Sequence, residues 1–450
     1  MNWIVIAIGT ALVLVLTAAS VGPYFVDWTA YRDTIEANAS RLIGVGVTID
    51  GDAEVRILPS PRIVVHNVGL GVGDAPLVTA RTVDLDVALM PLLSGELRVK
   101  QLRLDAPHVD VSISPAGTID FPPLQVDDGI QSLFTAEDVT VESITVEDGQ
   151  IELRDSRTGR THTVEGLALN GNARSLTGPF TAEGRAEIGG APATVRVAGG
   201  QLEAGTMPLS VRVTPQDANA EMSFEGAIVP RAEAPSVRGE LTVSAMAGTV
   251  PFSLSGGIAA DLSEIVFTRG TLSYGAPANA IELTAAASLS LIDNTPAVLA
   301  LSARQLDLDR LDRALFGSDT PTLRPPAETV EGIMEHLGPL YSLLMGQGGS
   351  AREVSVGLDL GAVVVGGALV EEVSLAARSN GTTFTIERAE AVFPGDSTAE
   401  FSGTLTGGVR GSLRLSAAQP SVLARWWSGA AAPNPLGGTI DPILLETDLS

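Results

Sequence analysis

The histidines and acidic residues of this chain could carry chemistry, but their spacing fits no known reactive arrangement. His66, His108, His162 and His336 are the only histidines, and no two of them stand at the spacing of metal ligands. Cysteine is absent, which excludes disulfide bonds, thiol catalysis and cysteine-bound zinc. The H-E-x-x-H, P-loop and G-x-S-x-G motifs are also absent. We therefore expect no enzymatic activity, no metal and no cofactor.

Two short segments imitate reactive sites. Gly69-Leu70-Gly71-Val72-Gly73 has the glycine content of a nucleotide-binding loop, but Asp74-Ala75-Pro76 follows it instead of a helix, which predicts a turn. Asp84 and Asp86 could act as the paired carboxylates of a glycosidase. They share one strand face between apolar neighbours, with no aromatic sugar platform nearby, so we interpret them as solvated surface acids. A hydrolase of unfamiliar type that uses scattered acids stays an alternative.

The composition limits the partners and the fold. The chain has 28 basic and 53 acidic residues, a net charge of −25 and an isoelectric point near 4.4. Lys100 is the only lysine, and no basic stripe exists that could follow a phosphate backbone, so nucleic acid is excluded as a partner. Apolar residues make up 45% of the chain but aromatic residues only 4%, so the interior must be aliphatic. Together with 48 glycines and 27 prolines, this indicates many short strands joined by tight turns.

The clearest pattern is a segment that occurs twice, 42 positions apart. The first copy reads Leu97-x-Val99-x-x-Leu102-x-Leu104, then Asp105-Ala106-Pro107, then Val109-x-Val111. The second reads Val139-x-Val141-x-x-Ile144-x-Val146, then Glu147-Asp148-Gly149, then Ile151-x-Leu153. The alternation predicts strands with one apolar face, the tripeptides predict turns, and the x-x spacing predicts a β-bulge. A recurring strand–turn–strand unit predicts a sheet that grows by addition of strands.

The apolar positions of the repeat and of the strand before it form a broad aliphatic surface, which is our candidate binding site. Its members are Val83, Leu85, Val87, Leu89, Leu97, Val99, Leu102, Leu104, Val109, Val111, Val139, Val141, Ile144, Val146, Ile151 and Leu153. Such a face must be buried against something. One possibility is a second sheet or closure of the sheet on itself. The other is a curved sheet whose apolar trough stays open and is filled by acyl chains, which need no fixed polar group.

The N-terminal segment, residues 1–26, predicts a membrane anchor. No charged side chain precedes Asp27, and the apolar run from Trp3 is long enough to cross a bilayer. Trp3, Tyr24, Phe25 and Trp28 would lie at the membrane interfaces. A cleaved signal peptide, with cleavage near residues 17–20, is the alternative, but no basic residue precedes the apolar run and the run continues beyond that site.

Residues 27–44 predict a short amphipathic helix. Asp27 would cap it, Gly44 would end it, and Trp28, Tyr31, Ile35 and Leu42 recur at helical spacing. Two interpretations stay open: the helix plugs the end of the sheet, or it lies on the membrane surface.

The first 180 residues carry a resemblance to a known family. The segments that carry it are residues 26–32, 39–44 and 55–61, Gly51, the alternating run 83–89, the Pro91–Gly95 turn, residues 97–107, Gly117 and residues 176–180. In this order, after an apolar N-terminal segment, they resemble the N-terminal region of the AsmA family.

Beyond these segments the chain continues as alternating runs with one helical block. We predict β-sheet over residues 45–300, a helical insertion and linker over 301–349, and further β-sheet over 350–450, where the final strand is either short or continues beyond Ser450. Ile265-x-Phe267-x-x-Gly270-x-Leu272 is loosely echoed by Phe384-x-Ile386-x-x-Ala389.

Short helices are predicted in this later part of the chain. Leu308, Leu311 and Leu315 predict a helix with Asp307 and Asp309 as candidate caps. A second helical segment covers 330–344, either packed on the sheet or mobile over an apolar cleft, and precedes a flexible link at 346–350. A last short helix covers 422–427, followed by a loop at 430–435.

The predicted fold is therefore mainly β: a transmembrane helix, then an elongated, curved antiparallel sheet that forms a groove, with a few short helices. The resemblance implies single-pass anchoring in the bacterial inner membrane, with the bulk of the chain in the periplasm. It also implies phospholipids, the inner membrane and other envelope proteins as partners, and passive phospholipid transfer toward the outer membrane. The alternative is a scaffold or assembly factor for outer-membrane proteins whose apolar core is filled by protein.

Overall fold

The computed structural model describes most of the chain after residue 27. The described residues are 28–43, 46–58, 60–71, 76–90, 98–114, 119–120, 140–156, 159–174, 178–216, 219–229, 235–247, 249–261, 263–292, 295–316, 325–326, 328–329, 353–380, 383–405, 409–429 and 442–449. They form two compact units, the first comprising Met1–Asp217 with Ser223–Val237 and the second comprising Ala218–Met222 with Arg238–Ser450. Each unit is described on its own.

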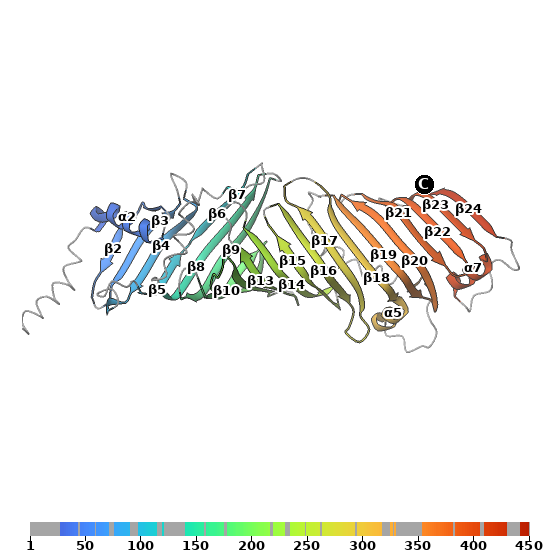
Figure 1. The fold of residues 1–450 in the computed structure, drawn as a ribbon. Helices are drawn as coiled ribbons and strands as arrows, with labels where there is room; N and C mark the ends of the chain where they lie inside the picture. Colours follow the sequence, from blue (N-terminus) through green and yellow to red (C-terminus); the bar gives the residue numbers. More distant parts are fainter. Residues whose placement is uncertain are drawn as a thin grey trace, which may run out of the picture. The chain divides into compact units, whose positions relative to one another are not determined.

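The first unit begins with two short helical segments and continues almost entirely as β-strands (Figure 1). The helical segments are η2 (Trp28–Tyr31) and α2 (Arg32–Ile43). The strands are β1 (Val47–Ile49), β2 (Ala53–Arg56), β3 (Arg62–Leu70), β4 (Val78–Val87), β5 (Arg98–Asp105), β6 (His108–Ile113), β7 (Ile119–Asp120), β8 (Thr140–Asp155), β9 (Arg160–Ala173), β10 (Phe180–Ile188), β11 (Ala191–Gly199), β12 (Met207–Pro215) and most of β13 (Glu221–Val229).

Most neighbouring strands of this unit are antiparallel, but one junction is parallel. β1 and β2 both pair with β3, β3 pairs with β4, and β4 pairs with β5, all antiparallel. β5 and β6 then run parallel to β8, and antiparallel pairing resumes from β8 through β12. The predicted mainly β fold is confirmed, whereas the expectation of a purely antiparallel sheet is wrong at this junction.

The parallel junction is made by the two copies of the repeat. Val99 pairs with Val141 and Leu104 with Val146 on β5 and β8, and Val109 pairs with Ile151 on β6 and β8. The repeated segments therefore lie side by side in register, so that equivalent apolar residues are direct neighbours.

The turns predicted inside the repeat are wrong. Asp105 pairs with Glu147 and His108 with Gln150 in the same strand direction, so the chain does not reverse. Ala106 and Asp148 instead adopt the left-handed conformation, with φ of 45° and 55°. A single residue in this conformation offsets a strand without turning it back, as in a β-bulge. Aspartate and the prolines and glycines nearby are turn formers, which explains the misprediction.

The predicted bulges are confirmed, and they occur in all four segments with the x-x spacing. The register shifts by one residue after Val99, between Val141 and Ile144, between Phe267 and Gly270, and between Ile386 and Ala389. In each segment two polar residues occupy the bulge, so the apolar residues on both sides of it stay on one face. The loose echo between residues 265–272 and 384–389 is thus a shared bulge.

The second unit repeats this organisation with different helices. Its strands are most of β14 (Ser236–Ala247), β15 (Val250–Ala260), β16 (Glu264–Tyr274), β17 (Ile281–Ser290), β18 (Ala297–Asp307), β19 (Val354–Val365), β20 (Ala368–Ser379), β21 (Phe384–Phe393), β22 (Ser397–Thr404), β23 (Arg410–Ala417) and β24 (Ile443–Leu449). β18 and β19 are parallel, whereas the pairs β15–β16, β16–β17, β17–β18 and all those from β19 to β24 are antiparallel.

Two helices pack near one end of these strands. α5 (Leu308–Phe316) places Leu308, Leu311 and Leu315 against a cluster that contains Phe252, Leu272 and Tyr274, as predicted from their spacing. α7 (Pro420–Ser428) contains the helix predicted over 422–427; its Trp426 lies 5.8 Å from Phe393 between ring centroids and donates from Nε1 to the Val365 carbonyl at 3.0 Å.

Of the two candidate caps of α5, one is confirmed and one is wrong. Asp307 Oδ1 accepts a hydrogen bond from the Arg310 backbone N–H at 2.8 Å, as an N-cap does. Asp309 instead accepts hydrogen bonds from Gly366 and Gly367 N–H at 2.7 and 2.8 Å, in the turn between β19 and β20. This buried carboxylate fixes α5 to a turn that is remote in sequence.

Several predictions lie outside the described residues. They are the anchor over residues 1–26, the cap Asp27, the helix end Gly44, the helical segment 330–344, the link 346–350 and the loop 430–435. Among the described helices, none is both long and apolar enough to span a membrane.

Candidate functional site

The candidate site is the apolar face of β2 to β9 in the first unit, where side chains form rows across the strands. One row joins Val55, Ile63, Leu85, Leu102 and Ile144 through direct register pairs. A second row joins Ala53, Val65, Val83, Leu104, Val146 and Leu169. Successive residues of a strand point to opposite faces, so each row is continuous on one side of the sheet.

The opposite face of the same strands is polar and carries ion pairs. Arg62 on β3 binds Asp84 on β4 with a 2.7 Å bond from Nε to Oδ1, and its Nε lies 3.8 Å from Asp86. The hydrogen bond to Asp84 raises the pKa of Arg62. Arg81 pairs with Asp105 at 3.2 Å, and Arg154 pairs with Glu152 at 2.7 Å and Asp110 at 3.5 Å. The two faces therefore differ sharply in chemistry.

Similar contacts give structural roles to the histidine, the acid pair and the glycine-rich segment that the sequence offered as candidate reactive sites. Asp84 and Asp86 both face Arg62, so they are ion-pair partners on the polar face. His66 Nδ1 lies 3.2 Å from Thr82 Oγ1 on the neighbouring strand. Gly69 and Leu70 belong to β3, and Gly71 N–H donates to the Gly46 carbonyl at 2.9 Å. Within the described residues no cluster of three metal-binding side chains occurs.

The structure places most of the predicted site residues together on the apolar face. Val83, Leu85, Val99, Leu102, Leu104, Val109, Val111, Val141, Ile144, Val146, Ile151 and Leu153 lie in the paired strands. Leu89 follows β4 in a short helical turn instead of a strand, and Leu97 and Val139 lie outside the described residues. Val87, Val99 and Val141 are buried within the protein, whereas Leu85, Leu102, Leu104, Ile144 and Val146 are half-buried.

Sequence reasoning missed the apolar residues of the flanking strands. Ile63 and Val65 on β3 and Leu169 on β9 extend the rows, and Val195, Val197, Val211 and Val213 continue alternation on β11 and β12. The period-2 alternation of these segments is the signal that could have found them.

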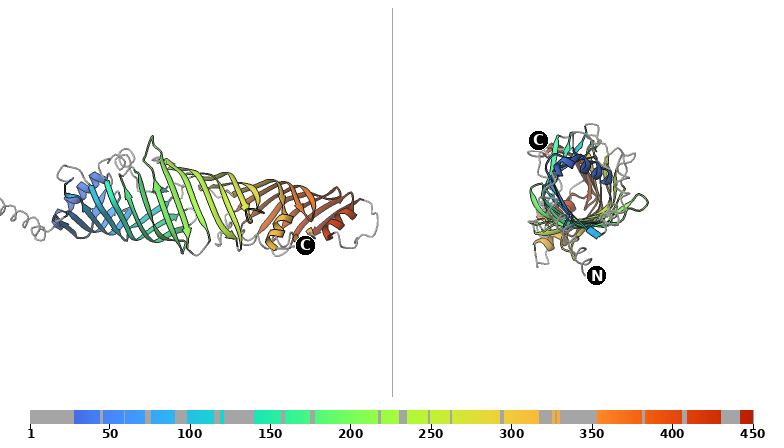
Figure 2. Two further views of the ribbon diagram at one scale, coloured as in Figure 1. Left: turned by 90° about the horizontal axis from the view of Figure 1, so that it is seen from below. Right: turned by 90° about the vertical axis from the view of Figure 1, so that its left-hand side faces the viewer.

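Among the residues that the structure describes, no second layer of strands covers this face. In each unit the described strands form one curved layer, and no second sheet stacks on it (Figures 1 and 2). In β10 Thr181, Glu183 and Arg185 are exposed and in β12 Ser210 and Arg212 are exposed, whereas the residues between them are only partly exposed. The described strands thus have a solvent-exposed side and a half-buried side.

Helix α2 closes the first edge of this face. Ser40 Oγ accepts from Val47 N–H at 2.8 Å, Glu36 Oε1 accepts from Ile49 N–H at 2.6 Å, and Arg32 Nη2 donates to the Gly51 carbonyl at 3.3 Å. Four helical residues rise about 6 Å, close to the length of two strand residues, so one contact per helical turn matches alternate strand positions. Ile35 and Ala39 of the same helix pack on Val47, Ile49 and Val65. The helix therefore satisfies the backbone of an edge strand and covers its apolar side.

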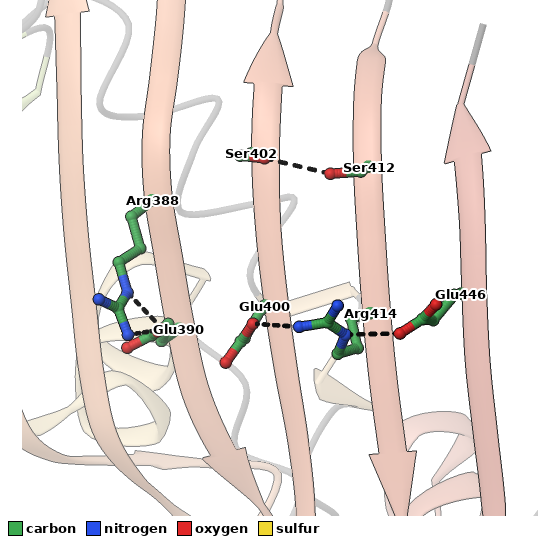
Figure 3. A network of polar contacts seen from close by, with 7 residues as sticks. All are labelled: Arg388, Glu390, Glu400, Ser402, Ser412, Arg414 and Glu446. Carbon is green, nitrogen blue, oxygen red and sulfur yellow. Dashed lines mark hydrogen bonds and ion pairs between the residues drawn. The ribbon is translucent and has the colours of Figure 1, made fainter.

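The polar side of the second unit contains an open cavity of about 510 Å³ lined by charged residues of β21 to β24. Arg414 lies between two carboxylates, 2.7 Å from Glu446 and 3.3 Å from Glu400, and Ser402 lies 3.2 Å from Ser412 (Figure 3). The hydrogen bond with Glu446 raises the pKa of Arg414. Arg414 therefore joins the three neighbouring strands β22, β23 and β24 through ion pairs with Glu400 and Glu446.

Comparison with known proteins identifies a family for the first part of the chain. No curated protein matches this chain. A sequence profile of the AsmA family matches residues 2–221, which includes α2 and β1 to β12 and the whole candidate site. Residues 2–221 therefore form an AsmA family domain.

Proposed function

We propose that this protein is anchored in the bacterial inner membrane and binds lipid acyl chains along its apolar face, assisting passive phospholipid transfer toward the outer membrane. The observation that carries the proposal is the set of continuous apolar rows across β2 to β9, which are half-buried and have no second layer of described strands over them. Acyl chains suit such a wall because they need apolar contact and no fixed hydrogen-bonding partner.

The arrangement of the two faces supports this proposal. The bulges keep the described apolar residues of the repeat on one side, and the charged residues form ion pairs on the other. A lipid bound on the apolar side would leave its headgroup at the margin of the sheet, in water. Membership of the AsmA family is consistent with an envelope protein that acts without catalysis.

A photo-crosslinking experiment tests the proposal in cells. A photoreactive residue is placed at Leu85, Leu104 or Val146, which are half-buried on the apolar face. The matched controls are Asp84, Arg103 and Thr145, which neighbour them on the polar face. Phospholipid attached only to the first set is the expected result. Absence of lipid at all three apolar positions, in folded protein, would mean that protein fills this face, and the scaffold interpretation would replace ours.

A further inference from the structure

Two apolar side chains are exposed at the same end of β2 and β4. Ile57 directly follows β2 and is 39% exposed, and Met90 follows β4 by three residues and is 75% exposed. Arg56 pairs with Arg62 and Arg62 with Asp86, so β2 and β4 end on the same side of the sheet with only β3 between them. Two strand spacings separate β2 from β4, which is about 10 Å.

Cationic side chains lie at the same end. Val87 N–H donates to the Pro61 carbonyl at 2.9 Å and Ala88 N–H to the Arg98 carbonyl at 2.8 Å, which places the start of β5 beside Met90. Arg98 and Lys100 flank the buried Val99, so their exposed side chains lie on the polar side at the start of β5, and neither forms an ion pair with another described residue. In a chain with a net charge of −25, this end of the strands thus combines apolar and positively charged groups.

The N-terminal part of the described chain reaches the sheet near this place. Segment η2 contacts β2, and α2 runs antiparallel to β1, as its contacts from Arg32 to Gly51 and from Ser40 to Val47 show. Tyr31 of η2 is 54% exposed. Residues 1–26, for which we predict a bilayer anchor, directly precede this segment in the sequence, so the proposed anchor would join the described chain beside β2.

We propose that a phospholipid of the anchoring bilayer enters the apolar face at the end of β2 and β4. Its acyl chains pass over Ile57 and Met90, and its phosphate contacts Arg98 and Lys100. Ile57 follows β2 two residues after Val55, so an acyl chain that crosses Ile57 reaches the end of the row of Val55, Ile63 and Leu85. This inference rests on the proposed function and names where the lipid enters and which cationic residues contact its phosphate.

The test uses the full-length protein with the photoreactive residue at Leu104 or Val146, beyond the entry. The double substitution Ile57→Glu and Met90→Glu introduces charge at the entry and is expected to lower lipid labelling at both positions at least five-fold. The control Leu369→Glu alters another exposed apolar side chain, 49%, at the start of β20; Leu369 precedes the buried Val370, so it faces away from the apolar side, and the change is expected to leave labelling unchanged. Thermal unfolding checks that each variant is folded, and Ile57→Gln with Met90→Gln replaces the first pair if it does not fold.

A second arm tests the contact with phosphate. In liposomes of phosphatidylglycerol, the double substitution Arg98→Glu and Lys100→Glu is expected to lower labelling about three-fold.

Undiminished labelling in the Ile57 and Met90 variants would overturn the entry site while leaving the proposed function intact. Absence of labelling in the unsubstituted protein would overturn both.

Discussion

The two units use the same strand pattern, yet they bury their apolar sides differently. In the first unit α2 covers only the edge at β1, and Leu85, Leu104 and Val146 stay half-buried. In the second unit α5 and α7 pack near the strand ends, and Tyr274 and Leu311 are almost completely buried. The same alternating strands thus form a buried core where a helix packs on them, and keep a half-buried apolar side at Leu85, Leu104 and Val146.

This comparison predicts that equal truncations have unequal effects in the two units. Leu311→Ala removes a fully buried side chain and leaves a cavity, so it should lower the free energy of unfolding of the second unit by about 3 kcal/mol. Leu104→Ala on the half-buried face should cost about 1 kcal/mol. Urea unfolding measures both, and equal losses would show that the first unit's face is also a packed core.

A close approach between neighbouring strands of the first unit should make Gly184 difficult to replace. A Cβ at Gly184 would lie 1.9 Å from the Ala168 carbonyl oxygen on the neighbouring strand, so Gly184→Ala should destabilise the unit by about 2–3 kcal/mol. The control is Gly357→Ala in the second unit, where a Cβ would meet no atom within 4 Å. A neutral Gly184→Ala, measured by thermal unfolding, would contradict the close strand approach seen here.

The attachment of the helices distinguishes the units again. Asp309 of α5 accepts from two backbone N–H groups and is buried, whereas Glu36 of α2 accepts from Ile49 N–H alone. Asp309→Asn should therefore cost about 1–2 kcal/mol, because its amide can accept only one of the two bonds and places a donor against the other N–H. Glu36→Gln should cost less, since Gln retains an acceptor oxygen. Hydrogen exchange at Gly366 and Gly367 would report the loss directly.

The smallest expected effect concerns the β15–β16 turn. Asp261 Oδ1 accepts from the Ser263 hydroxyl and from the Ser263 and Glu264 N–H groups, and these bonds lower the pKa of Asp261. Since the folded pKa lies below the unfolded one, the stabilisation is complete above the ordinary carboxyl pKa and is lost as the pH falls through the folded value. Asp261→Ala should thus be slightly less stable than the unsubstituted protein at neutral pH. The difference should vanish in strong acid, and one that persists there would rule out the charge as its cause.

The sequence predicted local features well and their partners poorly. The alternation of Val83 to Val87, the bulge spacing and the helix of Leu308, Leu311 and Leu315 follow from side-chain period and size, and the structure confirms them. The turns predicted at 105–107 and 147–149 were wrong. Ala106 and Asp148 interrupt the strand with a positive φ, but pairing with the neighbouring strands continues in the same direction on both sides of them.

What the sequence alone determined is which residues share a face and where the strands bulge, because both depend on spacing along one strand. Only the tertiary structure decided that the two copies of the repeat pair in parallel, that Arg62 holds Asp84, and that Asp309 binds a turn 57 residues away. These choices depend on hydrogen bonds and ion pairs between distant segments, for which many partners of the same chemistry compete in the sequence. In the folded chain the observed partner lies within bonding distance.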